Sequence, residues 1–545
     1  MRSWLTRTLP LFLLLARPAS AAETVLDLSG SVPEDGLRHF FIEFDVPAGT
    51  KEIEIAHDDL SSENILDWGL VDASGAFRGW GGGNEENAVV GELAASRSYR
   101  IGAIAPGKWK VVVGKAKIKV TPATYSVKVT LRDVPTLAAQ TERKAHAEPA
   151  PLALDTRWYA GDFHVHSIES GDAKPPLDEI ANYAKGRGLD FVMVSDHNTN
   201  SQLDFYAEAQ KKHPDFLFVP GVEFTTYWGH ANGIGATTYV DDKTELPGNS
   251  ITSAAQAFRG QGALFSLNHP TLALGDACIG CGWEQDLALE HIDAVEIGTG
   301  KFGILTDSAV TFWDDLCAKG RHLAALGGSD DHKAGVDETP TQSPIGSPTT
   351  LVYAKALSTA ALIDAISVGR TVVKLKGPDD PMVELVSSVA PNGDTIGGAT
   401  ELTATITGGT GTEHSARFVK NGKAEPEVSI DSDPFVLSLK VKAPASGEDR
   451  YRVEVLEGGS RRTVTSHLWV TAASGPGDAG VGGSGTGGSH AGTAADSSDD
   501  GGCGCELPGR ARANRVIALG LVGVGFGLWR RRARNRRGPP GPKLR

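Results

Sequence analysis

The sequence is poor in cysteine, in long apolar runs and, over most of its length, in positive charge. Five cysteines among 545 residues are too few for a disulfide scaffold. The apolar runs 9–16 and 516–529 are shorter than the roughly 20 residues of a membrane-spanning helix. The net charge is −14, although the chain from Arg510 onward is basic, so the remainder is strongly acidic. We therefore expect no nucleic-acid partner, since such surfaces carry basic patches.

The N-terminal end has the pattern of a cleaved secretory signal over residues 1–21. Arg2 and Arg7 precede the apolar run, and small residues at Ala19 and Ala21 are typical of a signal peptidase site. A membrane anchor is the alternative, but the run is short for one.

The C-terminal end has three successive segments. A tether rich in glycine and serine (473–502) precedes a tail (503–545) that contains Cys503, Cys505, the apolar run 516–529 and a run of arginines. The tether is too poor in apolar side chains to fold. The tail resembles the MYXO-CTERM sorting signal, which implies export to the outer membrane or cell surface, or secretion after processing. A short uncleaved anchor in contact with the membrane is the alternative.

Two regions of short alternating runs flank the middle of the chain. The first (23–135) predicts an antiparallel β-sandwich and resembles pre-peptidase C-terminal accessory domains, with binding or shielding as its expected role. A linker is expected over 136–154. The second region (381–472) predicts an immunoglobulin-like sandwich.

The middle region (155–376) alternates apolar strand-like runs with helical stretches, which predicts βα units around a parallel sheet. One run holds Asp162, His164 and His166 at every second position, and alternate strand residues share a face. Other strand-like runs lead to further metal-ligating residues, namely Asp196, His197, Glu223, His269, Glu296, Asp330, Asp331 and His332. In a parallel barrel, the C-terminal ends of the strands form one rim, where active sites lie.

These motifs resemble the polymerase and histidinol phosphatase (PHP) superfamily of metal-dependent hydrolases. The resemblance rests on Asp162-Phe163-His164-Val165-His166-Ser167, on Ser195-Asp196-His197-Asn198, on Gly221-Val222-Glu223, on Asn268-His269-Pro270 and on Gly328-Ser329-Asp330-Asp331-His332. It implies a distorted (β/α)₇ barrel with two or three divalent cations. Asp293 to Glu296 and Gly369-Arg370-Thr371 look like the secreted carbaryl-hydrolase-like (CehA/McbA) branch.

The resemblance also implies a set of metal ligands. The first metal would take His164, His166, Glu223 and Asp330; Glu223 would bridge to a second metal held by His230 and His269; and His197 and His332 would hold a third. Asp172 stands where some relatives place a histidine, which leaves the third site open. Asp162 is expected to support the ligands. These ligand types suit zinc, manganese or iron.

The expected chemistry is hydrolysis of a small-molecule ester. A hydroxide bridging two cations is a nucleophile at neutral pH. It would attack a phosphomonoester, a phosphodiester, or a carboxyl or carbamate ester, with Asp196, Asp331 and Glu223 as candidates for orienting ligands or moving protons. The alternative function is a non-catalytic, surface-displayed binding module with a metal-stabilised barrel.

Residues outside the ordered motifs receive simpler interpretations. Cys278 and Cys281 could be a redox pair, half a zinc site or, the favoured interpretation, a local disulfide in a loop at the rim. Cys317 is expected to be a buried apolar residue. His213 and His291 are expected to be surface residues.

Overall fold

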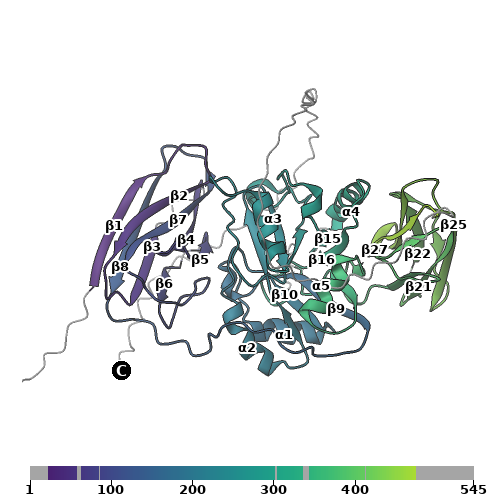
Figure 1. Cartoon of the computed structure of the whole chain (residues 1–545), viewed down its shortest axis with the longest axis horizontal. Helices are drawn as coiled ribbons and strands as arrows, with labels where there is room; N and C mark the ends of the chain where they lie inside the picture. The colour runs from purple at the N-terminus through teal and green to yellow at the C-terminus, as the bar shows by residue number, and fades with distance from the viewer. Residues whose placement is uncertain are drawn as a thin grey trace, which may run out of the picture. The chain divides into compact units, whose positions relative to one another are not determined.

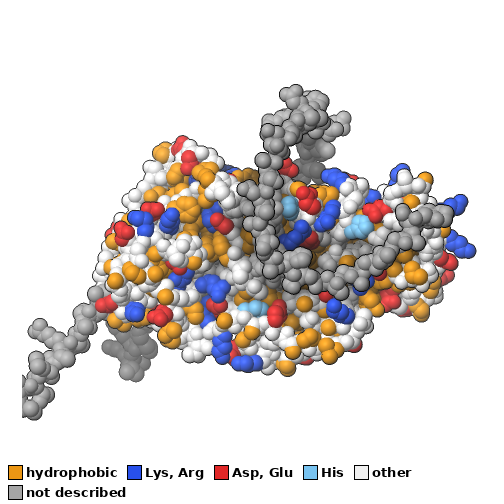
Figure 2. All heavy atoms as spheres, viewed as in Figure 1, with side chains coloured by type: hydrophobic (Ala, Val, Ile, Leu, Met, Phe, Trp, Pro, Cys, Tyr) orange, Lys and Arg blue, Asp and Glu red, His pale blue; other side chains and the backbone are white. Residues whose placement is uncertain are grey.

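A computed structural model describes residues 23–57, 63–84, 86–300, 303–335, 343–410 and 413–473. The predicted signal peptide, the C-terminal tail and all but the first residue of the predicted tether lie outside these ranges. Residues up to Ser474 group into one compact unit, so the composition boundaries near 135 and 380 do not separate independent bodies. No helix among the described residues is long and apolar enough to cross a membrane. On the face visible in Figure 2, basic and acidic side chains are interspersed.

The N-terminal part is a sandwich of two four-stranded sheets, ordered β1-β8-β3-β6 and β2-β7-β4-β5 (Figure 1). Alternation produces it: along β2, Ile42, Phe44 and Val46 point into a core that also holds Trp68 and Trp109. The strands are β1 (Glu23–Ser31), β2 (His39–Val46), β3 (Glu52–His57), β4 (Asn64–Val71), β5 (Phe77–Gly82), β6 (Ala88–Gly91), β7 (Gly107–Ile118) and β8 (Thr124–Arg132).

The predicted linker is docked on the protein. Arg143 is buried, and its guanidinium bonds to Asp204 at 3.2 Å and to the carbonyl of Tyr99 at 3.1 Å. Thr136 is tied to the carboxylate of Glu52. The segment therefore connects the first sandwich to the middle region through buried polar contacts.

The middle region contains two groups of strands. In one, β11-β10-β9 run parallel and β17 and β18 pair antiparallel beside β9; in the other, β12-β13-β14 are antiparallel neighbours and β14-β15-β16 are parallel. A closed (β/α)₇ barrel is therefore not seen as one continuous sheet, although isolated bridges join Val165 to Asp331 and His197 to Glu223. The strands are β9 (Arg157–Val165), β10 (Phe191–Val194), β11 (Leu217–Val219), β12 (Gly221–Thr226), β13 (Gly229–Ile234), β14 (Leu264–Leu267), β15 (Ala294–Thr299), β16 (Ala324–Gly328), β17 (Thr349–Ala354) and β18 (Thr371–Lys374).

Amphipathic helices cover these strands. In α1, Leu177, Ile180, Ala181 and Ala184 are buried, which is the spacing of one helix face. The helices are α1 (Leu177–Gly186), α2 (Leu203–Lys212), α3 (Ile251–Gly260), α4 (Gly303–Cys317) and α5 (Thr359–Ser367), with short 3₁₀ turns η1 (Ile168–Ser170), η2 (Gly275–Ala277) and η3 (Leu289–His291). Cys317 is buried, as expected, whereas His213 is buried against the expectation of a surface residue. The ring of His213 lies edge-on to Phe218, and this tertiary contact covers it.

The C-terminal part has a three-stranded sheet, β19-β21-β25, packed on strands that extend the sheet of the middle region. The extension occurs where β18 pairs antiparallel with β27. The second sandwich is therefore not a separate domain at the level of the sheet. Its strands are β19 (Met382–Ser387), β20 (Thr395–Gly397), β21 (Thr400–Thr407), β22 (His414–Lys420), β23 (Lys423–Ala424), β24 (Val428–Ser429), β25 (Phe435–Val441), β26 (Glu448–Glu457), β27 (Ser460–Thr465) and β28 (Leu468–Thr471).

Candidate metal centre

The ends of the middle strands meet at one place. The amide of Asp330, after β16, donates to the carbonyl of His164 on β9 at 2.8 Å, and the amide of Asn198, after β10, donates to the carbonyl of Glu223 on β12 at 3.0 Å. Gly328 permits this approach, because a Cβ there would lie 2.3 Å from that of His164. The strand-end residues are thereby brought together.

One group consists of His164, His166, Glu223 and Asp330, whose ligand atoms all lie within 4.8 Å of one another. The Nε2 atom of His164 lies 3.2 Å from Glu223 Oε1 and 3.3 Å from Asp330 Oδ1. The Nε2 atom of His166 lies 3.1 Å from Asp330 Oδ1. This is the residue set that the resemblance implies for the first metal.

Glu223 stands at the centre of the histidines. Its Oε1 atom lies 3.3 Å from His230 Nδ1 and 3.3 Å from His269 Nε2, and its Oε2 atom lies 2.8 Å from His197 Nδ1. His230 and His269 also form a group with the sulfur of Cys281, but that cysteine is disulfide-bonded to Cys278. A disulfide sulfur lacks the thiolate that binds metals, so Glu223 is the anionic partner of both rings.

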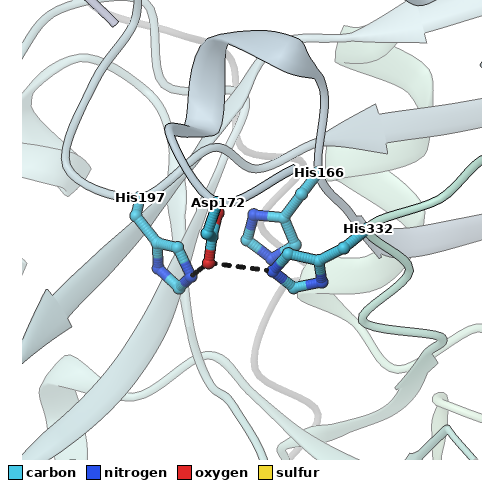
Figure 3. Close-up of side chains that lie close together, drawn as sticks. All are labelled: His166, Asp172, His197 and His332. Atoms are coloured by element: carbon cyan, nitrogen blue, oxygen red, sulfur yellow. Dashed lines mark ion pairs between the residues drawn. The ribbon is translucent and has the colours of Figure 1, made fainter. Parts of the chain in front are cut away.

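A further group brings His166, Asp172, His197 and His332 together. Asp172 lies between two of the rings, with Oδ2 at 3.4 Å from His197 Nε2 and 3.2 Å from His332 Nε2 (Figure 3). The resemblance left the role of Asp172 open, and the structure places its carboxylate beside both histidines of the third site.

The other ring nitrogen of each of three ligand histidines has a polar partner. His164 Nδ1 lies 2.9 Å from Glu296 Oε2, His197 Nδ1 lies 2.6 Å from Thr225 Oγ1, and His269 Nδ1 lies 3.0 Å from the carbonyl of Cys281. Such partners fix ring orientation and tautomer in metal sites. The sequence predicts that Glu296 lies near the rim, and the structure places its carboxylate against the ring of His164.

Three candidate aspartates contact the peptide framework instead of the cavity. Asp162 accepts from the amides of His164 and Gly346, Asp196 accepts from the amide and hydroxyl of Ser167, and Asp331 accepts from the amide of Gly335. All three are fully buried. This agrees with a supporting role for Asp162 and places Asp196 and Asp331 behind the ligands. Burial raises the pKa of Asp196 to about 8.

The electrostatics of the centre depend on close pairing of imidazoles with carboxylates. Burial by itself would raise the pKa of Glu223, but the neighbouring rings of His164 and His197 hold it well below its usual value. Burial opposes charge on His164, yet Glu223 and Asp330 raise its pKa well above the ordinary value. His166 behaves in the opposite way, because burial and two neighbouring histidines lower its pKa to about 3. The carboxylates of Glu223 and Asp330 thus favour the protonated ring of His164, and a bound cation would neutralise the same carboxylates.

The unpartnered atoms of the cluster fit a group of divalent cations. His164 Nε2, both ring nitrogens of His230 and Glu223 Oε2 are buried without a hydrogen bond among the described residues, although carboxylate and imidazole atoms lie close by. Buried polar atoms are costly without a partner. Two ligands, His269 and Asp330, also have left-handed backbone angles, φ +29° and +56°, a strain typical of functional sites.

A cavity of about 500 Å³ opens onto the centre. It is lined by His197, Glu223, His230, His269 and Asp330. The disulfide loop with Ile279 and a strip of the N-terminal sandwich that includes Asp67 and Trp80 also line it. No local sequence signal indicated these last residues, because the first sandwich carries no recognisable site motif.

No protein-family model matches the chain, and no curated protein matches it significantly. Among solved structures, it is similar to a two-domain protein from Bacteroides vulgatus ATCC 8482 containing a predicted PHP-like metal-dependent phosphoesterase (18% identity, 61% of this chain, 100% of that chain, TM-score 0.35). It is also similar to a putative metal-dependent phosphoesterase from Bifidobacterium adolescentis ATCC 15703 (15%, 31%, 87%, 0.24) and to a CARDB domain from Pyrococcus furiosus in complex with di-metal ions (18%, 17%, 93%, 0.14). With TM-scores this low, functional conclusions depend on the chemistry of the site.

Proposed function

We propose that this protein is an exported metal-dependent hydrolase of the PHP superfamily, closest to the CehA/McbA branch, in which the two groups of middle strands form the distorted barrel. The observation that carries the proposal is the central position of Glu223, which has ring nitrogens of five histidines within 3.5 Å of its carboxylate. Structural histidines are seldom gathered in this way. Imidazoles around one buried carboxylate are the donor set of a zinc, manganese or iron centre.

Three groups of ligand residues would bind the cations, and other side chains would support these ligands. His164, His166, Glu223 and Asp330 would hold one cation, Glu223, His230 and His269 a second, and Asp172, His197 and His332 a third. Bound divalent cations would polarise the ester and make water a nucleophile at neutral pH.

The side chains around the ligands keep this arrangement in place. Asn268 donates from Nδ2 to Glu223 Oε1 at 3.0 Å, which leaves the second oxygen facing His166 and His197. Glu296 holds the ring of His164 from behind. The buried aspartates Asp162, Asp196 and Asp331 hold the peptide framework around the ligands.

The substrate that these features favour is a phosphoester, or alternatively a carboxyl or carbamate ester. We also propose export, from the residue pattern of 1–21, and surface display or release through the C-terminal tail. No nucleic-acid binding is expected.

The test combines metal analysis with turnover. The purified full chain would be analysed for metal and then assayed with nitrophenyl phosphates, phosphodiesters, carboxyl esters and carbamates in the presence of Zn²⁺, Mn²⁺ or Fe²⁺. We expect metal-dependent turnover of at least one class, abolished by His164→Ala. Bound metal without turnover of any ester would instead support the surface binding module.

A further inference from the structure

Part of the cavity wall comes from the N-terminal sandwich. Strand β4 contributes Asp67, strand β5 contributes Trp80, and the backbone of Gly81 to Gly83 continues the wall to Asn84. The chain thus builds one pocket from segments that are far apart in sequence, such as Asn84 and Ser170.

This wall is fixed to the middle region by direct polar contacts. The hydroxyl of Tyr227, on the turn between β12 and β13, donates to Asp67 Oδ2 at 2.6 Å. Arg97 Nη1 donates to the carbonyl of Ala173 at 2.8 Å, and the amide of Ser98 donates to Glu169 Oε2 at 3.0 Å. The wall therefore stands at a defined place beside the ligand-bearing strands.

Close backbone packing at Gly171 brings the wall next to Asp172. Gly171 has φ +82°, and a Cβ there would lie 2.7 Å from the carbonyl oxygen of Gly81. Any side chain at this position would push the sandwich away from the third group of ligands. The glycine therefore allows the sandwich to pack against the loop that carries Asp172.

The wall offers one hydrogen-bond acceptor and one hydrogen-bond donor that have no partner among the described residues. Asp67 is held through Oδ2, and no described residue donates to its Oδ1 atom. Trp80 is only 5% exposed, yet no described residue accepts from its indole N–H. Both side chains line the cavity, and in ligand pockets a few polar groups fix the orientation of the ligand.

We propose that the cavity is a two-part substrate site, in which the metal ligands hold the reacting ester and Asp67 and Trp80 bind a hydroxyl or ammonium group on the leaving group. This rests on the proposed function, because it assigns the second half of the same pocket. Asp67 lines the cavity, so a leaving group that carries its own negative charge beside it is disfavoured. The volume of about 500 Å³ suits an ester with a ring-sized leaving group, since ligand pockets span roughly 300–1,000 Å³.

The test uses a matched set of esters with the full, metal-loaded chain. Phenyl phosphate is compared with its 4-aminomethyl, 4-hydroxymethyl and 4-carboxymethyl derivatives, or with the corresponding phenyl acetates if only carboxyl esters are cleaved. For the wild type, we expect kcat/KM to be highest for the aminomethyl and hydroxymethyl esters and lowest for the carboxymethyl ester. Asp67→Asn keeps the shape but removes the charge, and should lower the aminomethyl-to-phenyl ratio of kcat/KM about tenfold, the effect of one charged hydrogen bond.

Two more variants make the result specific. Trp80→Phe removes the indole N–H and should lower the hydroxymethyl-to-phenyl ratio several-fold. Asp45→Asn removes an exposed carboxylate on β2 of the same sandwich, 84% exposed, and should leave all ratios within about twofold of the wild type. Metal content and melting temperature are measured for each variant, so that lost metal or misfolding is recognised.

The outcomes separate the two proposals. Turnover by the wild type with ratios that do not respond to Asp67→Asn or Trp80→Phe would overturn the two-part site and leave the hydrolase proposal standing. No turnover of any ester by the metal-loaded wild type would overturn the proposed function and the two-part site with it.

Discussion

Replacing Glu223 by glutamine should strip metal from the centre without changing the shape of the side chain. Glu223 is 1% exposed, and its two oxygens face different histidines: Oε1 faces His164, His230 and His269 at 3.2–3.3 Å, whereas Oε2 faces His197 at 2.8 Å. An amide nitrogen cannot serve as a metal ligand in place of the lost oxygen. At least one site would lose a ligand and both would lose the shared negative charge.

The size of the effect follows from the position of Glu223 among the ligands. Loss of a partner behind a metal ligand already costs about 10–100-fold in affinity, so loss of a bridging carboxylate should weaken binding by at least about 100-fold, or about 2.7 kcal/mol. Chelator competition with Zn²⁺ would measure the dissociation constants. The metal-induced rise in melting temperature should shrink in parallel, because a ligand stabilises according to its occupancy.

Glu245→Gln provides the matched control. Glu245 Oε1 lies 2.7 Å from His39 Nδ1, so this variant removes a comparable carboxylate–imidazole pair that is not part of the metal groups. It should change the melting temperature of the metal-free protein but not the affinity for metal. If Glu223→Gln bound Zn²⁺ within about threefold of the wild type, the bridging role would be wrong.

Three further predictions concern the surroundings of the ligands. Glu296→Gln should weaken Zn²⁺ binding about 10–100-fold in the same competition assay, because it loosens the ring of His164; an unchanged affinity would contradict that support. Replacing Cys278 and Cys281 by serine should also weaken Zn²⁺ binding, though by less. The carbonyl of residue 281 that contacts His269 remains, but the disulfide no longer fixes the loop that carries it. An affinity equal to that of the wild type would show that the disulfide does not position the ring. Zn²⁺ binding at pH 7 should release protons, because the pKa of His164 is raised well above its ordinary value and a histidine ligand must lose its proton. The affinity for Zn²⁺ should therefore rise with pH. Calorimetric heats of binding that do not depend on the ionisation enthalpy of the buffer would refute this.

Much of the centre could be predicted from the sequence because its ligands follow local patterns. His164 lies near the end of β9 and His166 just after it, His197 and Asp330 follow β10 and β16, and Glu223 lies within β12 next to β11. Strand ends of neighbouring units meet by topology, so local positions were enough to indicate a shared rim. The close spacing of Cys278 and Cys281 likewise favoured the disulfide that the structure contains.

Other features depend on contacts between distant segments, which no local pattern encodes. Arg143 lies in a stretch with the composition of a linker, yet its partners Tyr99 and Asp204 bury it. The sequence pattern predicts Asp67 only as one polar residue of an alternating strand. The packing of the first sandwich against the middle region brings it to the cavity. The position of Asp172 depends on the loop after η1, whose path follows from tertiary packing.

The pairing of β18 with β27 has a consequence for synthesis on the ribosome. The two strands pair over Val372 to Lys374 and Thr463 to Thr465, so the partner of β18 emerges roughly 90 residues later, a delay of about 5–20 s at typical translation rates. During that interval the edge of β18 is open, and an exposed edge is a template for mispairing. The middle region therefore cannot complete its sheet until the C-terminal sandwich has been synthesised, and chains that end between these strands should be the species that chaperones recognise.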